Sequence, residues 1–352
     1  MALGTKLEEK ICKEPIPDLM NACLFYGPRD IRYEKVQVPQ IKDGEVLVKI
    51  DTALTCGTDL KTYFRGHPVL IQSIPSAFGH QFAGTIVKTG PDVKNFQAGQ
   101  RIVAVNTAPC FTCRFCKKEK YSLCENLEFL NGAYAEYISI PERIVQYNMY
   151  EIPSLASFEQ AAMLESLSVV LHGLEKAGVK EGDTVCVIGT GSIGLLFVAL
   201  LKLQGAQVVV IGRNGKKLKI AQELGADYVF SSSSSCFLSA NIVIEAVGET
   251  SAWELATEMV SPGGTVVFFG GCQKGIKVEL DTYKIHYKEL NMLGVFHHTP
   301  EHVKKAMGLL KNENLMEKLS SKIITCNMPL SELEEAFLLH AHGKVVQVAI
   351  KP

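Results

Sequence analysis

The chain has 352 residues, a length that predicts two domains of about 150–200 residues each. Its 36 Lys and Arg nearly balance 37 Asp and Glu, and the net charge of −1 argues against binding to nucleic acid or another polyanion. The longest apolar run, residues 193–203, is too short to span a bilayer. Residues 1–13 lack the apolar core of a signal peptide, so the 11 cysteines predict a reducing, cytoplasmic location.

The first part of the chain, residues 21–147, is rich in Val, Ile, Thr and Gly. Short alternating stretches, such as residues 45–50 and 84–88, are separated by turn signals, such as residues 42–44 and 89–92. This pattern predicts a mainly β domain built from short strands.

A pair of residues in this domain indicates a metal. Cys56 follows a strand-like run, and His80 follows 24 residues later. Either residue alone is most often part of a core, but the two together, flanked by glycines and acids, suggest two ligands of a catalytic zinc. The helical stretch at residues 158–177 offers a third ligand, Glu165. A buried Glu needs a partner, for which a metal and a neighbouring Lys are the alternatives.

Four cysteines on one short polar stretch predict a second metal site. Two gaps of two residues are followed by one of seven, at Cys110, Cys113, Cys116 and Cys124. Two-residue gaps let thiolates on one loop point at a common centre, as a structural zinc requires. Disulfides are the alternative. Zinc binding to four thiolates is worth about 10 kcal/mol, enough to fold a lobe that has almost no core.

Strands and helices alternate from about residue 156 onwards, which predicts an open parallel sheet with helices between its strands. The predicted strands are residues 183–188, 208–211, 242–245 and 265–269, and the predicted helices between them include residues 216–224 and 252–259.

The first of these strands ends in a glycine-rich loop that leads into an apolar helix. Its sequence is Gly189-Thr190-Gly191-Ser192-Ile193-Gly194. A G-x-G-x-x-G motif is weak alone, but it is strong between a strand and a helix. We expect Gly189 to allow the tight turn, Gly191 to let a pyrophosphate approach the backbone, and Gly194 to let helix and strand pack closely.

The end of the next strand predicts which dinucleotide binds. An NAD enzyme usually has Asp or Glu there to bind the ribose 2′-hydroxyl. Here the strand is followed by Gly212-Arg213-Asn214, with Lys217 nearby. A carboxylate would repel a 2′-phosphate, whereas Arg213 offers two parallel donors to it. The sequence therefore favours NADP, with NAD as the alternative. If Arg213 has no role in cofactor binding, it is an ordinary solvated residue of a surface loop.

We predict that the last part of the chain returns to the first domain, and that an apolar stretch before it forms an oligomer contact. Residues 332–340 read as a helix and residues 345–350 as a final strand. The apolar stretch at residues 290–296, near the edge of the parallel sheet, could pair across a two-fold axis to form a dimer or tetramer. We predict a catalytic domain at residues 1–160 with a zinc lobe at about 107–126, a coenzyme domain at 161–300, and a return at 301–352.

These motifs together resemble the zinc-dependent medium-chain dehydrogenase/reductase family over nearly the whole chain. The resemblance also covers Glu245-Ala246-Val247-Gly248 and residues 286–290. It implies an α/β fold in which a GroES-like, mainly β catalytic domain is combined with a Rossmann coenzyme domain, a doubly wound parallel sheet. Glu165 stands where alcohol dehydrogenases have a Cys ligand, which resembles the polyol branch: the sorbitol, threonine and butanediol dehydrogenases.

The resemblance also implies a mechanism and roles for single residues. Cys56, His80 and Glu165 would bind the catalytic zinc, which as a Lewis acid would favour the alkoxide of a secondary alcohol or polyol. That alkoxide would give a hydride to the nicotinamide of NADP. Thr58 would begin the proton relay, and Asp59 would orient a ligand. Val247 would lie at the cofactor.

Three positions depart from the family pattern. Gln81 replaces a Glu that often follows the ligand His, Ser166 replaces a frequent Pro, and Lys61 replaces a His that ends the proton relay, which leaves the proton exit open. One alternative function is an NAD-linked sorbitol- or threonine-type dehydrogenase. An alternative of another class is a catalytically silent nucleotide-binding relative that keeps the fold. The sequence does not name the substrate.

Overall fold

The structure is a computed structural model that describes residues 15–67, 70–71, 73–232 and 239–352. The prediction drawn from residues 1–13 therefore lies outside the described residues. Contacts within the chain define two compact units. The first comprises residues 1–165, 303–320 and 324–352, and the second comprises residues 166–302 and 321–323. In the described ranges, none of the helices combines the length and the apolar composition that crossing a bilayer demands.

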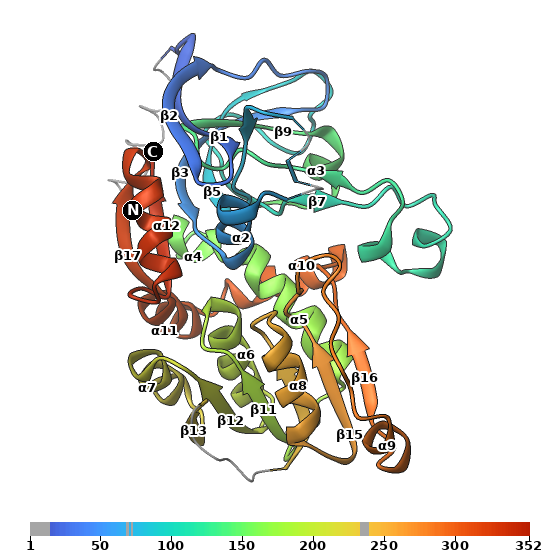
Figure 1. Cartoon of the computed structure of the whole chain (residues 1–352). Coiled ribbons are helices and arrows are strands. Elements are labelled where there is room, and N and C mark those ends of the chain that lie inside the picture. The colour runs from blue at the N-terminus through green and yellow to red at the C-terminus, as the bar shows by residue number, and fades with distance from the viewer. Residues whose placement is uncertain (1–14, 68–69, 72, 233–238) are drawn as a thin grey trace. The chain divides into compact units, whose positions relative to one another are not determined.

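The first unit is built mainly from antiparallel β-sheets, as the alternating stretches predict (Figure 1). One sheet has the order β2-β1-β4, a larger one the order β10-β6-β5-β3-β18-β17 with β9 paired to β3, and a ribbon joins β7 to β8. The strands are β1 (Leu19–Gly27), β2 (Asp30–Gln37), β3 (Val46–Leu54), β4 (Ser76–Ala77), β5 (Phe82–Thr89), β6 (Arg101–Ala104), β7 (Thr107–Ala108), β8 (Glu128–Phe129), β9 (Tyr137–Ile140), β10 (Met149–Glu151), β17 (Ile324–Pro329) and β18 (Gln347–Lys351).

Short helices connect these strands. They are α2 (Gly57–Arg65), η1 (Cys116–Lys118), η2 (Tyr121–Leu123), α3 (Glu142–Tyr147), α4 (Phe158–Ala162), η3 (Leu330–Glu332) and α12 (Leu333–Ala341), while α10 (Pro300–Leu309) and α11 (Glu313–Ile323) belong to both units in part. The core between the sheets is apolar and contains a group of aromatic rings, among them Phe78, Tyr134 and Phe337. Phe78 and Phe82 of this core stand two residues before and two residues after His80.

The second unit is the predicted parallel sheet with helices between its strands. Its order is β13-β12-β11-β14-β15-β16, and every neighbouring pair is parallel. This is the 3-2-1-4-5-6 order of dinucleotide-binding sheets. Its elements are α5 (Leu164–Ala177), β11 (Thr184–Ile188), α6 (Ser192–Leu203), β12 (Gln207–Gly212), α7 (Gly215–Leu224), β13 (Tyr228–Ser231), β14 (Ala240–Glu245), α8 (Thr250–Met259), β15 (Val260–Phe268), α9 (Thr282–Tyr287) and β16 (Asn291–Gly294). The predicted parallel architecture is confirmed.

One predicted helix is divided in two. The apolar periodicity at residues 158–177 predicts a continuous helix, but the structure ends α4 at Ala162 and begins α5 at Leu164. At Met163 the backbone N–H bonds to the carbonyl of Gln160, three residues back, and ψ is −5°. The turn therefore tightens and the regular helical ladder stops. As a result Glu165 lies in the first turn of α5.

The C-terminal strand lies inside the first unit. β18 pairs in parallel with β17 and antiparallel with β3, so that residues near 350 lie beside the strand that leads to Cys56. Thr55 is joined to this strand twice, because its N–H bonds to the carbonyl of Val348 and its hydroxyl accepts the N–H of Val348. The end of the chain therefore fixes the backbone next to Cys56.

Candidate metal and dinucleotide sites

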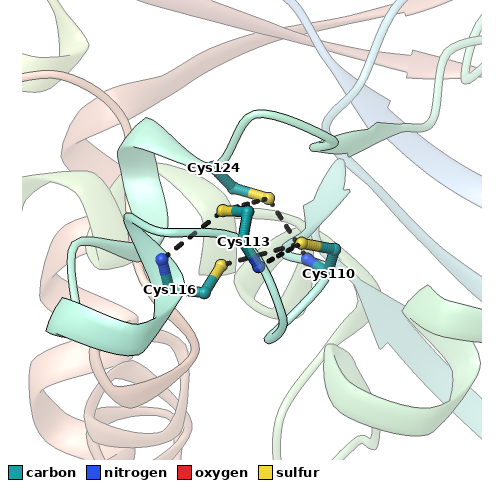
Figure 2. Close-up of side chains that lie close together, drawn as sticks. All are labelled: Cys110, Cys113, Cys116 and Cys124. Atoms are coloured by element: carbon teal, nitrogen blue, oxygen red, sulfur yellow. Dashed lines mark hydrogen bonds between the residues drawn. The ribbon is translucent and has the colours of Figure 1, made fainter.

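The four predicted cysteines lie together in a small lobe between β7 and β8 (Figure 2). Their four sulfur atoms lie within 4.8 Å of one another, and the Cys110–Cys116 and Cys113–Cys124 Sγ distances are both 4.0 Å. A tetrahedral ion with Zn–S bonds of ~2.3 Å needs sulfurs ~3.8 Å apart. The described cysteines are free thiols, so the alternative of disulfides is wrong. The donor set fits zinc.

Backbone amides turn toward these sulfurs. Cys124 Sγ accepts the N–H of Cys110 at 3.2 Å, Cys110 Sγ that of Cys113 at 3.4 Å, and Cys113 Sγ that of Cys116 at 3.5 Å. The Thr112 hydroxyl also donates to Cys110. This hydroxyl and the amides lower the pKa of Cys110 to about 5, because hydrogen bonds to a thiolate favour the charged form. Hydrogen bonds from backbone amides also lower the pKa of Cys113, whereas burial raises the pKa of Cys116 to about 12 and raises that of Cys124. The loop therefore favours the thiolate at two of its four sulfurs.

A second group of side chains that could hold a metal lies at the start of α2. Cys56 is the N-cap of this helix, and His80 lies in the loop before β5. Cys56 Sγ and His80 Nε2 are 3.4 Å apart, and both side chains are buried. The only other residue that offers a ligand atom within 4.8 Å of both, among the described residues, is Asp59. The structure brings together the two ligands that sequence reasoning paired.

Asp59 connects and orients these two side chains. His80 donates from Nδ1 to Asp59 Oδ1 at 3.0 Å, and the Cys56 N–H donates to Asp59 Oδ2 at 3.1 Å. Burial lowers the pKa of His80, but the charges of Cys56 and Asp59 outweigh it and raise that pKa overall. A ligand His that donates its other ring nitrogen to a carboxylate has a fixed tautomer, with Nε2 left for a metal. The arrangement therefore fits a metal held by Cys56 and His80.

Tyr134 is a member of this site that sequence reasoning missed. Its hydroxyl donates to Asp59 Oδ2 at 2.7 Å from 75 residues along the chain, and its ring is buried. Tyr134 follows an alanine and lies just before a strand, so it reads as core in the sequence. In the structure it also occupies the space beside Gly79 (φ +89°), where a Cβ would lie 2.6 Å from its ring. Gly79 thus leaves room for the Tyr134 ring whose hydroxyl donates to Asp59.

Glu165 lies close to this group but outside it. Its carboxylate is buried and accepts a hydrogen bond of 2.6 Å from Gln81, the residue after His80. Burial raises the pKa of Glu165, and the charge of His80 and the bond from Gln81 oppose that rise. Thr58, predicted for the proton relay, is half-buried in the first turn of α2, where its carbonyl accepts the Thr62 hydroxyl.

The glycine loop of the second unit has the geometry that dinucleotides require. Gly189 has φ +116°, which other residues rarely adopt. A Cβ on Gly194 would lie 2.1 Å from the carbonyl oxygen of Gly189, so helix and strand pack closely only because Gly194 has no side chain. The space beside Gly191, the N-cap of α6, is open. A phosphate could approach the first amides of α6, including those of Ser192 and Ile193.

The loop after β14 is fixed beside Gly189. Glu245 is fully buried, and its Oε1 accepts the N–H groups of Val247 at 2.6 Å and Gly248 at 2.7 Å. A Cβ on Gly189 would lie 3.0 Å from the Val247 side chain. Val247 therefore lies against the glycine loop, and its role at the cofactor stays a prediction.

The predicted NADP selector is more crowded than the sequence suggests. A Cβ on Gly212 would lie 2.7 Å from Thr190 Cγ2 and 2.9 Å from its Oγ1. Arg213 is 75% exposed and lies 3.6 Å from the carboxylate of Glu249, which is 54% exposed. Asn214 caps α7 by accepting the N–H groups of Lys216 and Lys217. Thr190 thus fills the place where an acidic side chain would begin.

Lys217 is a stronger candidate than Arg213 for binding a phosphate in this region. Its side chain is half-buried in the first turn of α7, and burial lowers its pKa. None of the carboxylates in the described residues forms an ion pair with it. A cation that is partly removed from water without an anion beside it is unfavourable, and a bound anion would relieve this cost.

Comparison with known proteins gives one consistent family. Residues 42–154 match the alcohol dehydrogenase GroES-like domain, and residues 192–312 match the zinc-binding dehydrogenase domain. D-arabinitol dehydrogenase 1 of Uromyces fabae is 31% identical over 96% of this chain and 99% of its own length. Sorbitol dehydrogenase of Bombyx mori is 28% identical over 94% of this chain and 97% of its own.

A solved structure agrees with this result. The structure of a protein from Sinorhizobium meliloti 1021, named as a zinc-binding dehydrogenase and bound to NADP, is 28% identical and has a TM-score of 0.86. The superposition covers 96% of this chain and 100% of the other. The predicted combination of a GroES-like domain and a doubly wound parallel sheet is confirmed.

Proposed function

This chain belongs to the zinc-dependent medium-chain dehydrogenases, in their polyol branch, and we propose that it oxidises a secondary alcohol of a polyol with NADP as hydride acceptor. It is an oxidoreductase that uses zinc and a nicotinamide cofactor. The observation that carries the proposal is the buried group of Cys56, His80 and Asp59 with Glu165 close by.

In this proposal Cys56, His80 and Glu165 hold the catalytic zinc. Bound zinc supplies a Lewis acid for the alcohol oxygen, and bound nicotinamide supplies the hydride acceptor. Asp59 holds His80 in the tautomer that leaves Nε2 without a proton. Tyr134 and the Cys56 amide in turn hold Asp59, so that the ligand pair keeps one geometry. Thr58 would begin the proton relay: its hydroxyl would accept the proton of the substrate and pass its own proton on toward solvent.

We propose that the four-cysteine lobe holds a second, structural zinc. All its potential ligands are cysteines within 14 residues of one another along one segment, which is typical of closed structural sites. The amides that donate to the sulfurs support the same assignment.

NADP is proposed over NAD because of Gly212, Thr190 and Lys217. Thr190 excludes an acidic side chain at position 212, and the half-buried cation Lys217 lacks an ion pair in the described part of the chain. Arg213 is a weaker argument, since an exposed side chain near Glu249 contributes little. The NAD-linked sorbitol- or threonine-type enzyme is the alternative.

A homo-oligomer, a dimer or tetramer, is proposed from the edge of the parallel sheet. β16 is the outermost strand, and large side chains near it are exposed, including those of Tyr283, Tyr287 and Phe296. An open strand edge flanked by apolar side chains pairs readily with a second copy. We also propose residues 1–160 and 301–352 as the catalytic domain and 161–300 as the coenzyme domain, and a cytoplasmic location, where thiolate ligands stay reduced.

The experiment that tests the function is an assay of the purified protein with polyols, secondary alcohols and amino alcohols, using NADP and NAD in parallel. We expect turnover of a polyol, a higher kcat/KM with NADP, and two zinc ions per chain. One zinc per chain and no turnover with either cofactor would favour the catalytically silent relative and refute the proposal.

A further inference from the structure

Two buried glutamines connect the C-terminal strand to Glu165. Gln347, the first residue of β18, donates from Nε2 to Gln81 Oε1 at 3.0 Å. Gln81 donates from Nε2 to Glu165 Oε2 at 2.6 Å. Gln81 is 2% and Gln347 is 1% exposed. Three segments that are far apart in the sequence therefore meet in one line of hydrogen bonds.

The donors and acceptors of the two side-chain amides decide which way each amide faces in this line of hydrogen bonds. A carboxamide nitrogen has two hydrogens to donate, and its oxygen only accepts. The nitrogen of Gln347 bonds to the carbonyl of Thr55 at 2.9 Å and to Gln81, so both its hydrogens have acceptors. The oxygen of Gln81 must then face Gln347, and its nitrogen must face Glu165. The reverse orientation would place two donors together and two acceptors together.

This arrangement uses one oxygen of Glu165 and leaves the other for a ligand. The bond from Gln81 is made to Oε2, and no other described residue donates a hydrogen bond to the carboxylate. The same line also reaches the neighbour of Cys56, because Gln347 is bonded to Thr55. The amides therefore link the backbone beside one proposed zinc ligand to the side chain of another.

Resting on the proposed function, we propose that Gln81 is a positioning residue of the catalytic metal site: held in one orientation by Gln347, it fixes the carboxylate of Glu165 so that the oxygen it does not bind faces the metal. Because Gln81 is an uncharged amide, it donates to Glu165 without adding a second carboxylate next to it.

A purely structural role of Gln81 would affect the stability of the fold but not the binding of the metal. Any buried hydrogen-bonded glutamine costs stability when it is removed, so a loss of stability alone decides nothing. Gln160 offers a matched control, because it too is buried and donates an amide hydrogen to a carboxylate, that of Glu317. The metal-binding properties distinguish the two cases.

The experiment uses the zinc-loaded full-length protein and the variants Gln81→Met, Gln347→Met and Gln160→Met. Zinc retained against increasing chelator is measured for the two sites separately, and cobalt is then exchanged into the catalytic site to record its ligand-field absorption. We expect Gln81→Met to weaken the catalytic zinc by about 10- to 100-fold, the usual effect of removing a partner of a metal ligand, and to alter the cobalt spectrum. Gln347→Met should give a smaller loss, and Gln160→Met none.

A double-mutant cycle with Glu165→Ala tests whether Gln81 acts through Glu165. In that background Gln81→Met should change zinc affinity no further. The inference would be overturned if Gln81→Met kept the zinc affinity and cobalt spectrum of the wild type, or if it lost the same zinc affinity with and without Glu165. In either case an active, zinc-containing wild type would still support the proposed function. A wild type without zinc at Cys56 and His80 would overturn both.

Discussion

The contact between Gly212 and Thr190 leads to a prediction about cofactor choice. Gly212→Asp is the obvious change to obtain an NAD enzyme, because the new carboxylate would accept the ribose hydroxyl and repel a 2′-phosphate. In this fold, however, the new Cβ would lie 2.7 Å and 2.9 Å from two Thr190 atoms and 3.2 Å from Leu218. Thr is branched at Cβ and has few rotamers with which to move away. The single substitution should therefore strain the nucleotide loop.

The magnitude follows from the overlap. Overfilling a packed site costs about 1–3 kcal/mol, which for a unit of this size lowers Tm by roughly 2–4 °C per kcal/mol. Thr190→Ala removes both close atoms, so the double variant should recover most of that stability. Because one charge-assisted hydrogen bond is worth about 1.5–3 kcal/mol, the double variant should shift the ratio of kcat/KM for NADP and NAD by at least about tenfold toward NAD.

The assay compares wild type, both single variants and the double variant by thermal unfolding and by kcat/KM with each cofactor. Thr190→Ala alone is the control, and it should leave the cofactor ratio near that of wild type. A Gly212→Asp protein as stable as wild type would refute the packing argument. A double variant with unchanged preference would refute Gly212 as the selector, and the ribose would then be recognised by other groups, such as Lys217.

Three further predictions test other parts of the structure. Cys113→Ala should reduce zinc by one ion per chain and lower stability, as measured by metal analysis and thermal unfolding; unchanged metal content would disprove the structural site. Burial raises the pKa of Asp227, but the hydrogen bonds from Lys202 and the Val208 amide outweigh burial and lower that pKa overall. Asp227 therefore contributes to the stability of the fold above its unfolded pKa of ~3.9. This contribution is lost as the pH falls through the lower pKa of the folded state. Asp227→Asn should thus lose about 1 kcal/mol at pH 7 and less at pH 2 in denaturant titrations; an equal loss at both pH values would contradict this. Phe296→Lys should dissociate the proposed oligomer in light scattering, and a wild-type protein that is already monomeric at micromolar concentration would exclude the interface.

The sequence determined the parts of this protein that depend on short spacing. The gaps between Cys110, Cys113, Cys116 and Cys124 are geometric constraints within one loop, and the structure brings all four sulfurs together. The glycine motif at residues 189–194 is similar, because each glycine answers a local need of one turn and one helix start. The alternation of strands and helices predicted the parallel sheet for the same reason, since each element buries its own apolar face.

The tertiary structure alone decided contacts between distant segments. The bond from Tyr134 to Asp59 spans 75 residues, and that from Gln347 to Gln81 spans 266. In the sequence, Tyr134 is an ordinary aromatic residue, and Gln81 and Gln347 are ordinary amides. A hydrogen bond between distant residues leaves no periodic pattern in the sequence by which it could be recognised. The overlap of Thr190 with Gly212 and the end of α4 at Ala162 likewise depend on how the chain packs. Residue types and spacing predicted which side chains would meet a metal or a phosphate; the folded backbone decided which neighbours hold those side chains in place.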